Sequence, residues 1–331
     1  MDTYTRATLH WLDQRFALFT DGIYLPNQPS YGFSKVAERL EEYARTMAIL
    51  AALDRLAPAS LLDVGAADGY FPEFVRRAFG APTIGAELSG TACLRAWELY
   101  GLPVIPADAH QLPFRDGAFD VTVCSEVLEH VTDPARVISE LWRVTAGALV
   151  LTTPRAKDQQ TKAAHFDNLD PNEPHAHIHY FTEEDMRALL PARTLLWGAR
   201  SKLTARLWPA IAEDIDGREA SFRKALFDFV AATSEMTPAR RAGLHSALLD
   251  RYDQPPGLLA RMARPRAIKH LLLLDLWLAR RRPALCHDFL AIALRPGRQV
   301  GPPRRPAGRL LDNLLFDFHV PPLRAEMAAR R

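Results

Sequence analysis

The stretch LLDVGAADGYF, residues 61–71, joins an apolar segment to a run of small residues. The apolar part predicts a buried strand that ends at Asp63 and Val64, and the small residues predict a tight turn into a helix that begins near Tyr70. Small side chains let a ligand approach the backbone closely, and the first amide groups of the helix face that ligand. This stretch alone fits a ligand-binding loop, such as one for NAD, or a tight turn without a ligand.

Strands and helices alternate on the C-terminal side of this turn. Apolar segments predict strands, and amphipathic segments between them predict helices. The expected strands are 60–64, 82–87, 102–107, 119–125 and 148–154, and the expected helices are 70–79, 90–100 and 134–144. This alternation predicts a parallel sheet that is covered on both faces and binds its ligand beyond the carboxyl ends of the strands.

The remainder of the chain has a different pattern. Residues 34–56 have helical spacing, and 155–180 read as a polar, His-rich loop that leads to a helix at 182–190 and a sixth strand at 192–199. Residues 205–282 are mainly helical, and 288–294 predict an isolated strand that completes the sheet. The expected parts are a helical leader (1–58), a core (59–200), a helical insertion (201–283), the last core strand (284–296) and a tail (297–331).

Two acidic residues follow the next two strands at the same edge of the sheet. Glu87 lies 24 residues after Asp63, where a carboxylate can accept hydrogen bonds from both hydroxyl groups of a ribose. Asp108 is placed to meet an adenine amino group, with Leu112 and Phe114 as apolar surface. Helix capping or core packing would explain each residue singly, but their ordered combination favours a nucleoside ligand.

These segments, with CSEVLEHV at 124–131 where the fourth strand ends, resemble the successive motifs of class I S-adenosylmethionine (SAM)-dependent methyltransferases. The closest likeness is to the large subgroup that methylates small molecules, and it covers about residues 61–154, with weaker support to 190 and at 288–294. It implies an α/β fold: a Rossmann-like, seven-stranded, mostly parallel sheet with helices on both faces and an antiparallel last strand. Ala67 departs from the family, which usually has glycine there. The spacing G-x-G-x-x-G of NAD sites is absent from residues 63–71.

The resemblance also implies which residues bind SAM. The loop at 63–69 would cradle the amino-acid part, Glu87 would hold the ribose, Asp108 would contact the adenine, and Glu126 would lie beneath the sulfonium. The predicted SAM-binding residues are Asp63, Gly65, Ala66, Ala67, Gly69, Glu87, Leu88, Asp108, Ala109, Ser125 and Glu126.

Histidines that follow the fifth strand are candidates for a catalytic base. Methyl transfer is an in-line displacement that needs alignment and exclusion of water, and a hydroxyl or protonated amine acceptor also needs a base. The candidates are His165, His175, His177 and His179.

An extended segment would point the last three histidines to one side, where Asp167 or Glu173 could complete a metal site. Packing within the loop explains the same pattern, and we assign no metal here. His130 is expected to be structural, and the leader aromatics Trp11, Tyr24, Tyr31 and Phe33 form either a lid or part of the core.

Charge and hydropathy constrain the partners. The formal net charge is +2, but the segment 261–309 holds twelve Lys and Arg against two acidic residues. This segment is either a solvated surface or a site for an anion, and we expect no nucleic acid. Residues 271–278, beside Arg280–Arg282, either bind an anionic, amphipathic acceptor or form a buried helix that ends in cations.

Targeting signals are not evident in the sequence. It shows no segment apolar enough to span a bilayer and no signal-peptide pattern, although peripheral membrane contact stays open. The three cysteines are far apart and indicate no disulfide framework, so we expect a cytoplasmic protein.

The sequence therefore predicts an enzyme that uses SAM to methylate a small molecule, with oxygen favoured as the acceptor atom and sugar, lipid-linked and secondary-metabolite acceptors all open. The alternatives are an RNA or protein methyltransferase that uses the basic C-terminal third, and a SAM-binding partner protein without catalysis. The sequence does not indicate the oligomeric state.

Overall fold

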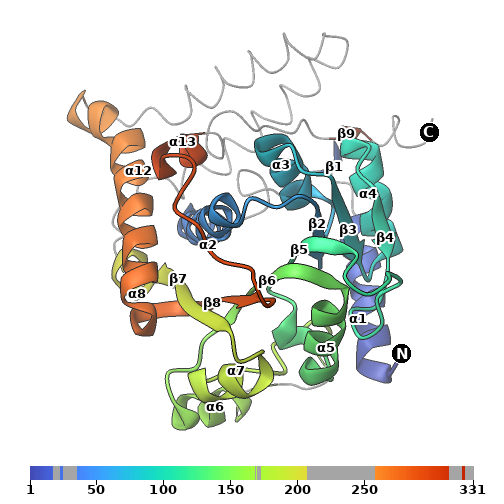
Figure 1. Ribbon diagram of the computed structural model, residues 1–331. Helices are drawn as coiled ribbons and strands as arrows, with labels where there is room; N and C mark the ends of the chain where they lie inside the picture. The colour runs from blue at the N-terminus through green and yellow to red at the C-terminus, as the bar shows by residue number, and fades with distance from the viewer. Residues whose placement is uncertain are drawn as a thin grey trace.

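A seven-stranded sheet forms the centre of the molecule (Figure 1). The computed structural model describes residues 1–17, 23–24, 36–167, 169, 173–206, 258–312 and 323–324. The strand order is β4-β3-β2-β5-β6-β8-β7. The bounds are β2 (Leu61–Val64), β3 (Thr83–Glu87), β4 (Val104–Pro106), β5 (Phe119–Ser125), β6 (Thr145–Pro154), β7 (Thr194–Ser201) and β8 (Cys286–Leu294).

Strand β8 lies between β6 and β7 and is antiparallel to both, whereas the other neighbouring pairs are parallel. Every residue of β8 except His287 is buried, because helices cover both faces of the sheet at this position. The expected fold, including the antiparallel strand from the C-terminal part of the chain, is confirmed. A separate short ladder pairs β1 (Ile23–Tyr24) with β9 (Leu323–Arg324).

Helices form a layer on each face of the sheet (Figure 1). Helices α2 (Val36–Leu56), α3 (Tyr70–Phe79) and α12 (Leu258–Arg281) share one apolar core with β5, β6 and β8. Helices α5 (Pro134–Val144) and α7 (Glu183–Leu189) pack into a second core on the other face. The remaining helices are α1 (Thr3–Ala17), α4 (Gly90–Tyr100), α6 (Gln159–Phe166), α8 (Lys202–Ala205) and α13 (Ala307–Asp312), with 3-10 turns at Leu128–His130 and Pro283–Leu285.

Capping residues explain why several helices begin where the sequence predicts. The side chains of Ser89 and Asp133 accept hydrogen bonds from the backbone amides of Ala92 and Arg136, which begins α4 and α5. Thr182 and Asp185 form a reciprocal capping box that begins α7.

The structure corrects one part of the sequence analysis. Residues 155–180 were expected to form a loop, but Gln159–Phe166 are the helix α6, which Asp158 caps by accepting from the amide of Thr161 at 2.8 Å. None of its residues is buried, so the helix carries no apolar stripe that periodicity could reveal.

Residues 258–281 of the expected helical insertion form a single helix, α12. In α12, Leu272 and Leu276 are buried, whereas Leu274 and Trp277 are 39% and 50% exposed, so only one face of residues 271–278 packs on the core. Residues 207–257 of the insertion, and the leader residues Tyr31 and Phe33, lie outside the described residues. Within the described ranges, no helix has the length and apolar character needed to cross a membrane.

Candidate functional site

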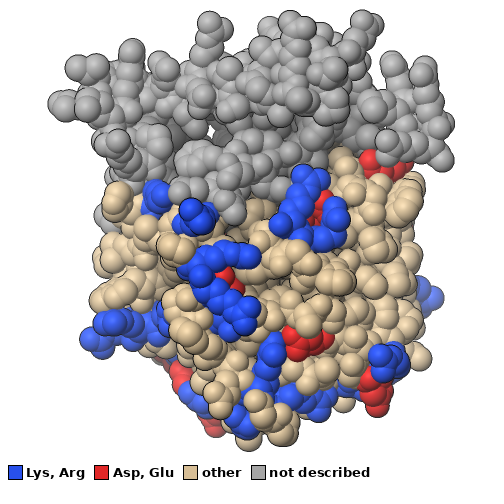
Figure 2. Space-filling view, turned by 45° about the horizontal axis from the view of Figure 1, so that its top comes forward, with Lys and Arg blue, Asp and Glu red and all other residues tan. Residues whose placement is uncertain are grey.

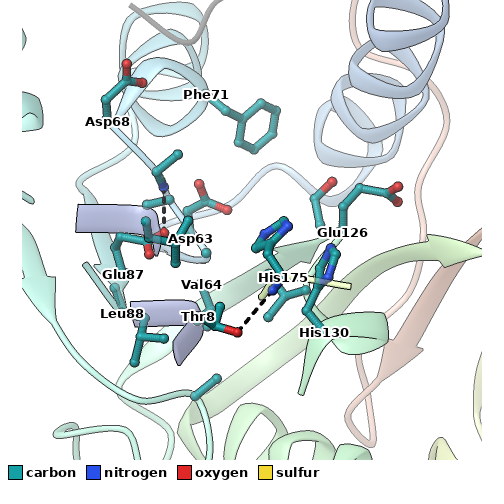
Figure 3. Close-up of a pocket in the computed structure, with 18 of the residues that line it drawn as sticks. Thr8, Asp63, Val64, Asp68, Phe71, Glu87, Leu88, Glu126, His130 and His175 are labelled. Carbon is teal, nitrogen blue, oxygen red and sulfur yellow. Dashed lines mark hydrogen bonds between the residues drawn. The ribbon is translucent and has the colours of Figure 1, made fainter. Parts of the chain in front are cut away.

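A cavity of about 350 Å³ lies beyond the carboxyl ends of β2, β3 and β5 (Figure 3). Ten of the eleven predicted SAM-binding residues line it, and Gly69 is the exception. Residues of α1, including Thr8 and Trp11, and of α2, including Arg45, form the opposite walls. The sheet edge and the two leader helices therefore line one shared cavity.

The turn after β2 requires small residues at two positions. Gly65 and Gly69 have φ angles of 81° and 83°, which favour glycine. A Cβ atom on Gly65 would lie 2.2 Å from Val127 Cγ2, and one on Gly69 would lie 2.8 Å from Ala96 Cβ. A larger residue would therefore clash at either position, and Gly65 also lines the cavity.

Ala67 also has a left-handed backbone, with φ of 47°. This conformation is uncommon for a residue with a Cβ atom, which gives a physical reason why glycine would be favoured at this position. The Ala67 amide donates a hydrogen bond to Glu87 Oε2 at 2.9 Å. That bond connects the loop directly to the end of β3.

Glu87 is buried at the end of β3, where Figure 3 shows its side chain directed at the loop after β2. Its second carboxylate oxygen accepts a hydrogen bond from the Ser89 amide at 3.1 Å. Burial raises the pKa of Glu87, and the bonds from the backbone amides oppose this shift. The carboxylate is thus held in one orientation at the place predicted for the ribose.

Asp63 is buried at the end of β2, and its burial beside Glu87 raises its pKa to about 8. Without a ligand, most Asp63 carboxyl groups are therefore protonated at pH 7. SAM carries a sulfonium and an ammonium group, and a nearby cation favours the ionised form of a carboxyl group.

We therefore expect SAM binding at pH 7 to release up to about one proton from Asp63. Since the bound state prefers the ionised carboxylate, SAM affinity should rise as the pH increases from 6 to 8. Calorimetry in buffers with different ionisation enthalpies measures this release. The Asp63→Asn variant should release no proton, and heats that are equal in all buffers for the wild type would refute the linkage.

Asp108 is held in place by a hydrogen-bonded histidine. Its Oδ1 accepts from the His110 amide at 2.9 Å and lies 2.6 Å from His110 Nδ1. His110 Nε2 accepts from the Asp133 amide at 3.3 Å, so Nδ1 carries the proton that is donated to Asp108. The other Asp108 oxygen stays available at the position predicted for the adenine.

Glu126 lies after β5 in a left-handed backbone conformation with φ of 55°. Its carboxylate accepts from Thr152 Oγ1 at 3.0 Å and from Arg45 Nη1 at 2.8 Å. The Thr152 hydroxyl is also 2.8 Å from that of Ser125. Burial raises the pKa of Glu126, and the Arg45 guanidinium opposes this rise.

The structure separates the four candidate histidines. His175 alone among them lines the cavity, beside His130 (Figure 3). Its ring stacks on those of Trp11 at 4.8 Å and His130 at 3.8 Å. His165 Nε2 donates to the His177 carbonyl at 2.8 Å, outside the lining. His179 stacks on Phe181, also outside the lining.

His175 has a φ of 60°, so the His-rich segment is not regularly extended. Burial lowers the pKa of His175 to about 4 and that of His130 to about 3. Both rings that face the cavity are therefore neutral at pH 7.

Several cavity residues were missed or assigned no function from the sequence, among them Arg45, Thr8 and His130. Arg45 and Thr8 come from the leader, and His130 was expected to be only structural. Arg45 is the sole charged residue in the stretch ARTMAILAAL, 44–53, and a single charge in an apolar helix could have indicated a buried partner. Tyr24, a predicted lid or core residue, is buried and donates to Asp68 Oδ2 at 2.8 Å.

Comparison with known proteins finds methyltransferases. Residues 36–194 match a protein family described as "Methyltransferase domain". The chain is 31% identical over 148 residues to demethylmenaquinone methyltransferase of Thermobifida fusca, and the alignment spans 38% of this chain and 61% of that protein. It is 41% identical over 90 residues to a ubiquinone biosynthesis O-methyltransferase of Ralstonia nicotianae, and this alignment spans 25% of this chain and 37% of that protein.

Among solved structures, the chain aligns with magnesium protoporphyrin IX methyltransferase from Synechocystis with bound SAM. The two share 16% identity over 59% of this chain and 88% of that one, with a TM-score of 0.42. The curated relatives are matched over less than two thirds of their own length, 61%, 29% and 50% for the first three.

Proposed function

Because residues 36–194 form a class I SAM-dependent methyltransferase domain, we propose that this chain transfers a methyl group from SAM to a hydroxyl oxygen of a small molecule. The observation that carries the proposal is the shared cavity. It unites the motif residues after β2, β3 and β5 with side chains of α1 and α2. A volume of about 350 Å³ is in the range of small-molecule sites.

The cavity wall indicates how the acceptor would be positioned. In the proposed arrangement the amino-acid end of SAM lies on the loop at 63–69, and its sulfonium lies near Glu126. The acceptor then occupies the space between α1 and α2, against Trp11 and Phe71, which supply aromatic surface. Walls on several sides limit the directions from which the acceptor oxygen can approach the methyl group.

The names of several relatives support oxygen as the acceptor atom. They include tocopherol O-methyltransferase of Arabidopsis thaliana, 34% identical over 102 residues, and the ubiquinone biosynthesis O-methyltransferases. We infer from these names that a ring-bearing hydroxyl compound is the first acceptor class to test.

The placement of the basic residues argues against RNA as the acceptor. Figure 2 shows Lys and Arg in separate groups on one face, several of them around acidic residues, and not as one continuous band. Several arginines of 261–309 contact aromatic or acidic side chains of the same chain. These pairs are Arg280 with Trp197, Arg281 with Trp277, Arg295 with Trp142, Arg298 with Asp120, and Arg305 with Phe79.

Methyl transfer from isotopically labelled SAM tests the proposed function. The acceptors would be catechol, a hydroquinone with a short isoprenoid chain, a hexose, total RNA and a protein extract. We expect label in a hydroxyl compound and none in RNA or protein. Label in RNA or protein would replace the proposal with the corresponding macromolecular activity. SAM binding without turnover on any acceptor would favour a non-catalytic partner protein.

A further inference from the structure

Three side chains converge on one point beside the cavity, although they are up to 48 residues apart in sequence. One potential ligand atom each from Glu129, His130 and His177 lies within 4.8 Å of the others. Two of them, Glu129 Oε1 and His130 Nε2, are 4.0 Å apart. This set differs from the one considered from the sequence, which combined the alternating histidines with Asp167 or Glu173.

Glu129 provides an independent indication that a ligand is bound here. Its side chain is fully buried, and Oε2 accepts a hydrogen bond from Thr153 Oγ1 at 3.0 Å. The other oxygen, Oε1, is buried without a hydrogen-bond partner in the described part of the chain. A buried carboxyl oxygen without a partner is costly, and this oxygen is the one that lies 4.0 Å from His130 Nε2.

The His130 ring is oriented as a metal ligand would be. Its Nδ1 lies 3.0 Å from the Ala176 carbonyl, which can only accept, so Nδ1 carries the proton. Nε2 then presents a lone pair toward Glu129 Oε1. A metal-binding histidine usually donates its other ring N–H to a carbonyl or carboxylate group in this way. Ala176 is itself held by a second donor, Tyr4 Oη, at 2.8 Å.

We propose that Glu129, His130 and His177 bind one divalent transition-metal ion of the Zn²⁺ class. Two imidazoles and one carboxylate suit Zn²⁺, Co²⁺ or Fe²⁺ better than Mg²⁺ or Ca²⁺, which prefer oxygen ligands. Bonds of about 2.0–2.1 Å require ligand atoms to be roughly 3.4 Å apart, so the set must contract on binding. His177 is exposed and can move inward without disturbing the core.

The ion would have an open coordination position, because the described residues supply three ligands to a metal that commonly takes four. Since His130 lines the cavity, the ion would lie beside the proposed acceptor site, where it could polarise a hydroxyl group. This role rests on the proposed function. The binding of the metal does not, because it needs neither SAM nor an acceptor.

Calorimetric titration of Zn²⁺ into chelator-treated protein tests the site, with Co²⁺ absorption as a second readout. We expect one ion per chain, and at least tenfold weaker binding by His177→Ala and by Glu129→Gln. His10→Ala, which removes an exposed histidine of α1, should bind as the wild type does. His177 is exposed and Glu129→Gln preserves shape, so thermal unfolding without metal should show that both variants fold.

Two results would overturn the proposed metal site. One is the absence of Zn²⁺ binding by the wild type, and the other is wild-type affinity in His177→Ala. A protein that binds Zn²⁺ at these residues but methylates no hydroxyl compound would refute the proposed function and leave the metal site established.

Discussion

Replacing Glu87 with alanine should weaken SAM binding at least tenfold. The family resemblance assigns the ribose hydroxyl groups to Glu87, and the structure orients its carboxylate at the end of β3 through the amides of Ala67 and Ser89. Loss of the bonds to the ribose should cost about 1.4 kcal/mol or more, which corresponds to a tenfold change in Kd. Calorimetry with SAM and with S-adenosylhomocysteine measures this effect.

Two controls distinguish lost contacts from a damaged fold. Glu184→Ala removes an exposed glutamate of α7 and should leave the Kd unchanged. Glu87→Gln keeps one acceptor oxygen and should have an intermediate Kd. Thermal unfolding verifies that the Glu87→Ala variant folds. If the folded variant binds SAM with a Kd within twofold of the wild type, the assigned ribose site is contradicted.

Replacing Arg45 with methionine should lower the free energy of unfolding by about 3 kcal/mol. Arg45 pairs with Glu126 at 2.8 Å, and the two side chains are only 13% and 20% exposed. Removing one partner leaves the other charge buried without compensation, which is the costly case for a buried ion pair. Urea denaturation, followed by circular dichroism, measures the loss.

A second substitution tests whether the uncompensated Glu126 charge causes the loss of stability in Arg45→Met. Adding Glu126→Gln to the variant removes the stranded charge and should recover at least half of the lost stability. Arg187→Met, which breaks the exposed pair with Glu183 on α7, should cost less than about 1 kcal/mol. If Arg45→Met unfolds at the same urea concentration as the wild type, the pair does not stabilise the junction between the leader and the sheet.

Local sequence patterns predicted the core elements closely. The expected bounds of α3, α4, α5 and β5 are those of the structure. These elements have a regular apolar pattern, and capping residues such as Ser89 and Asp133 mark where α4 and α5 begin. Helix α6 was missed because it buries none of its residues, so its formation depends on its cap and leaves no periodic signal.

The sequence by itself determined the fold class, and it predicted that the SAM site lies at the carboxyl ends of the strands. Both depend on short-range features: apolar strands, small residues in the turn at 65–69, and carboxylates directly after successive strands. Because parallel strands end at the same edge of the sheet, residues that directly follow them lie together at that edge.

Only the tertiary structure decided which distant side chains meet at that edge. It placed Arg45 of the leader against Glu126, and it separated His175, which lines the cavity, from His165, His177 and His179. It also brought His177 to Glu129 and His130. Such contacts join segments that are far apart in the chain, and they depend on how helices and loops pack on the sheet, which no local pattern encodes.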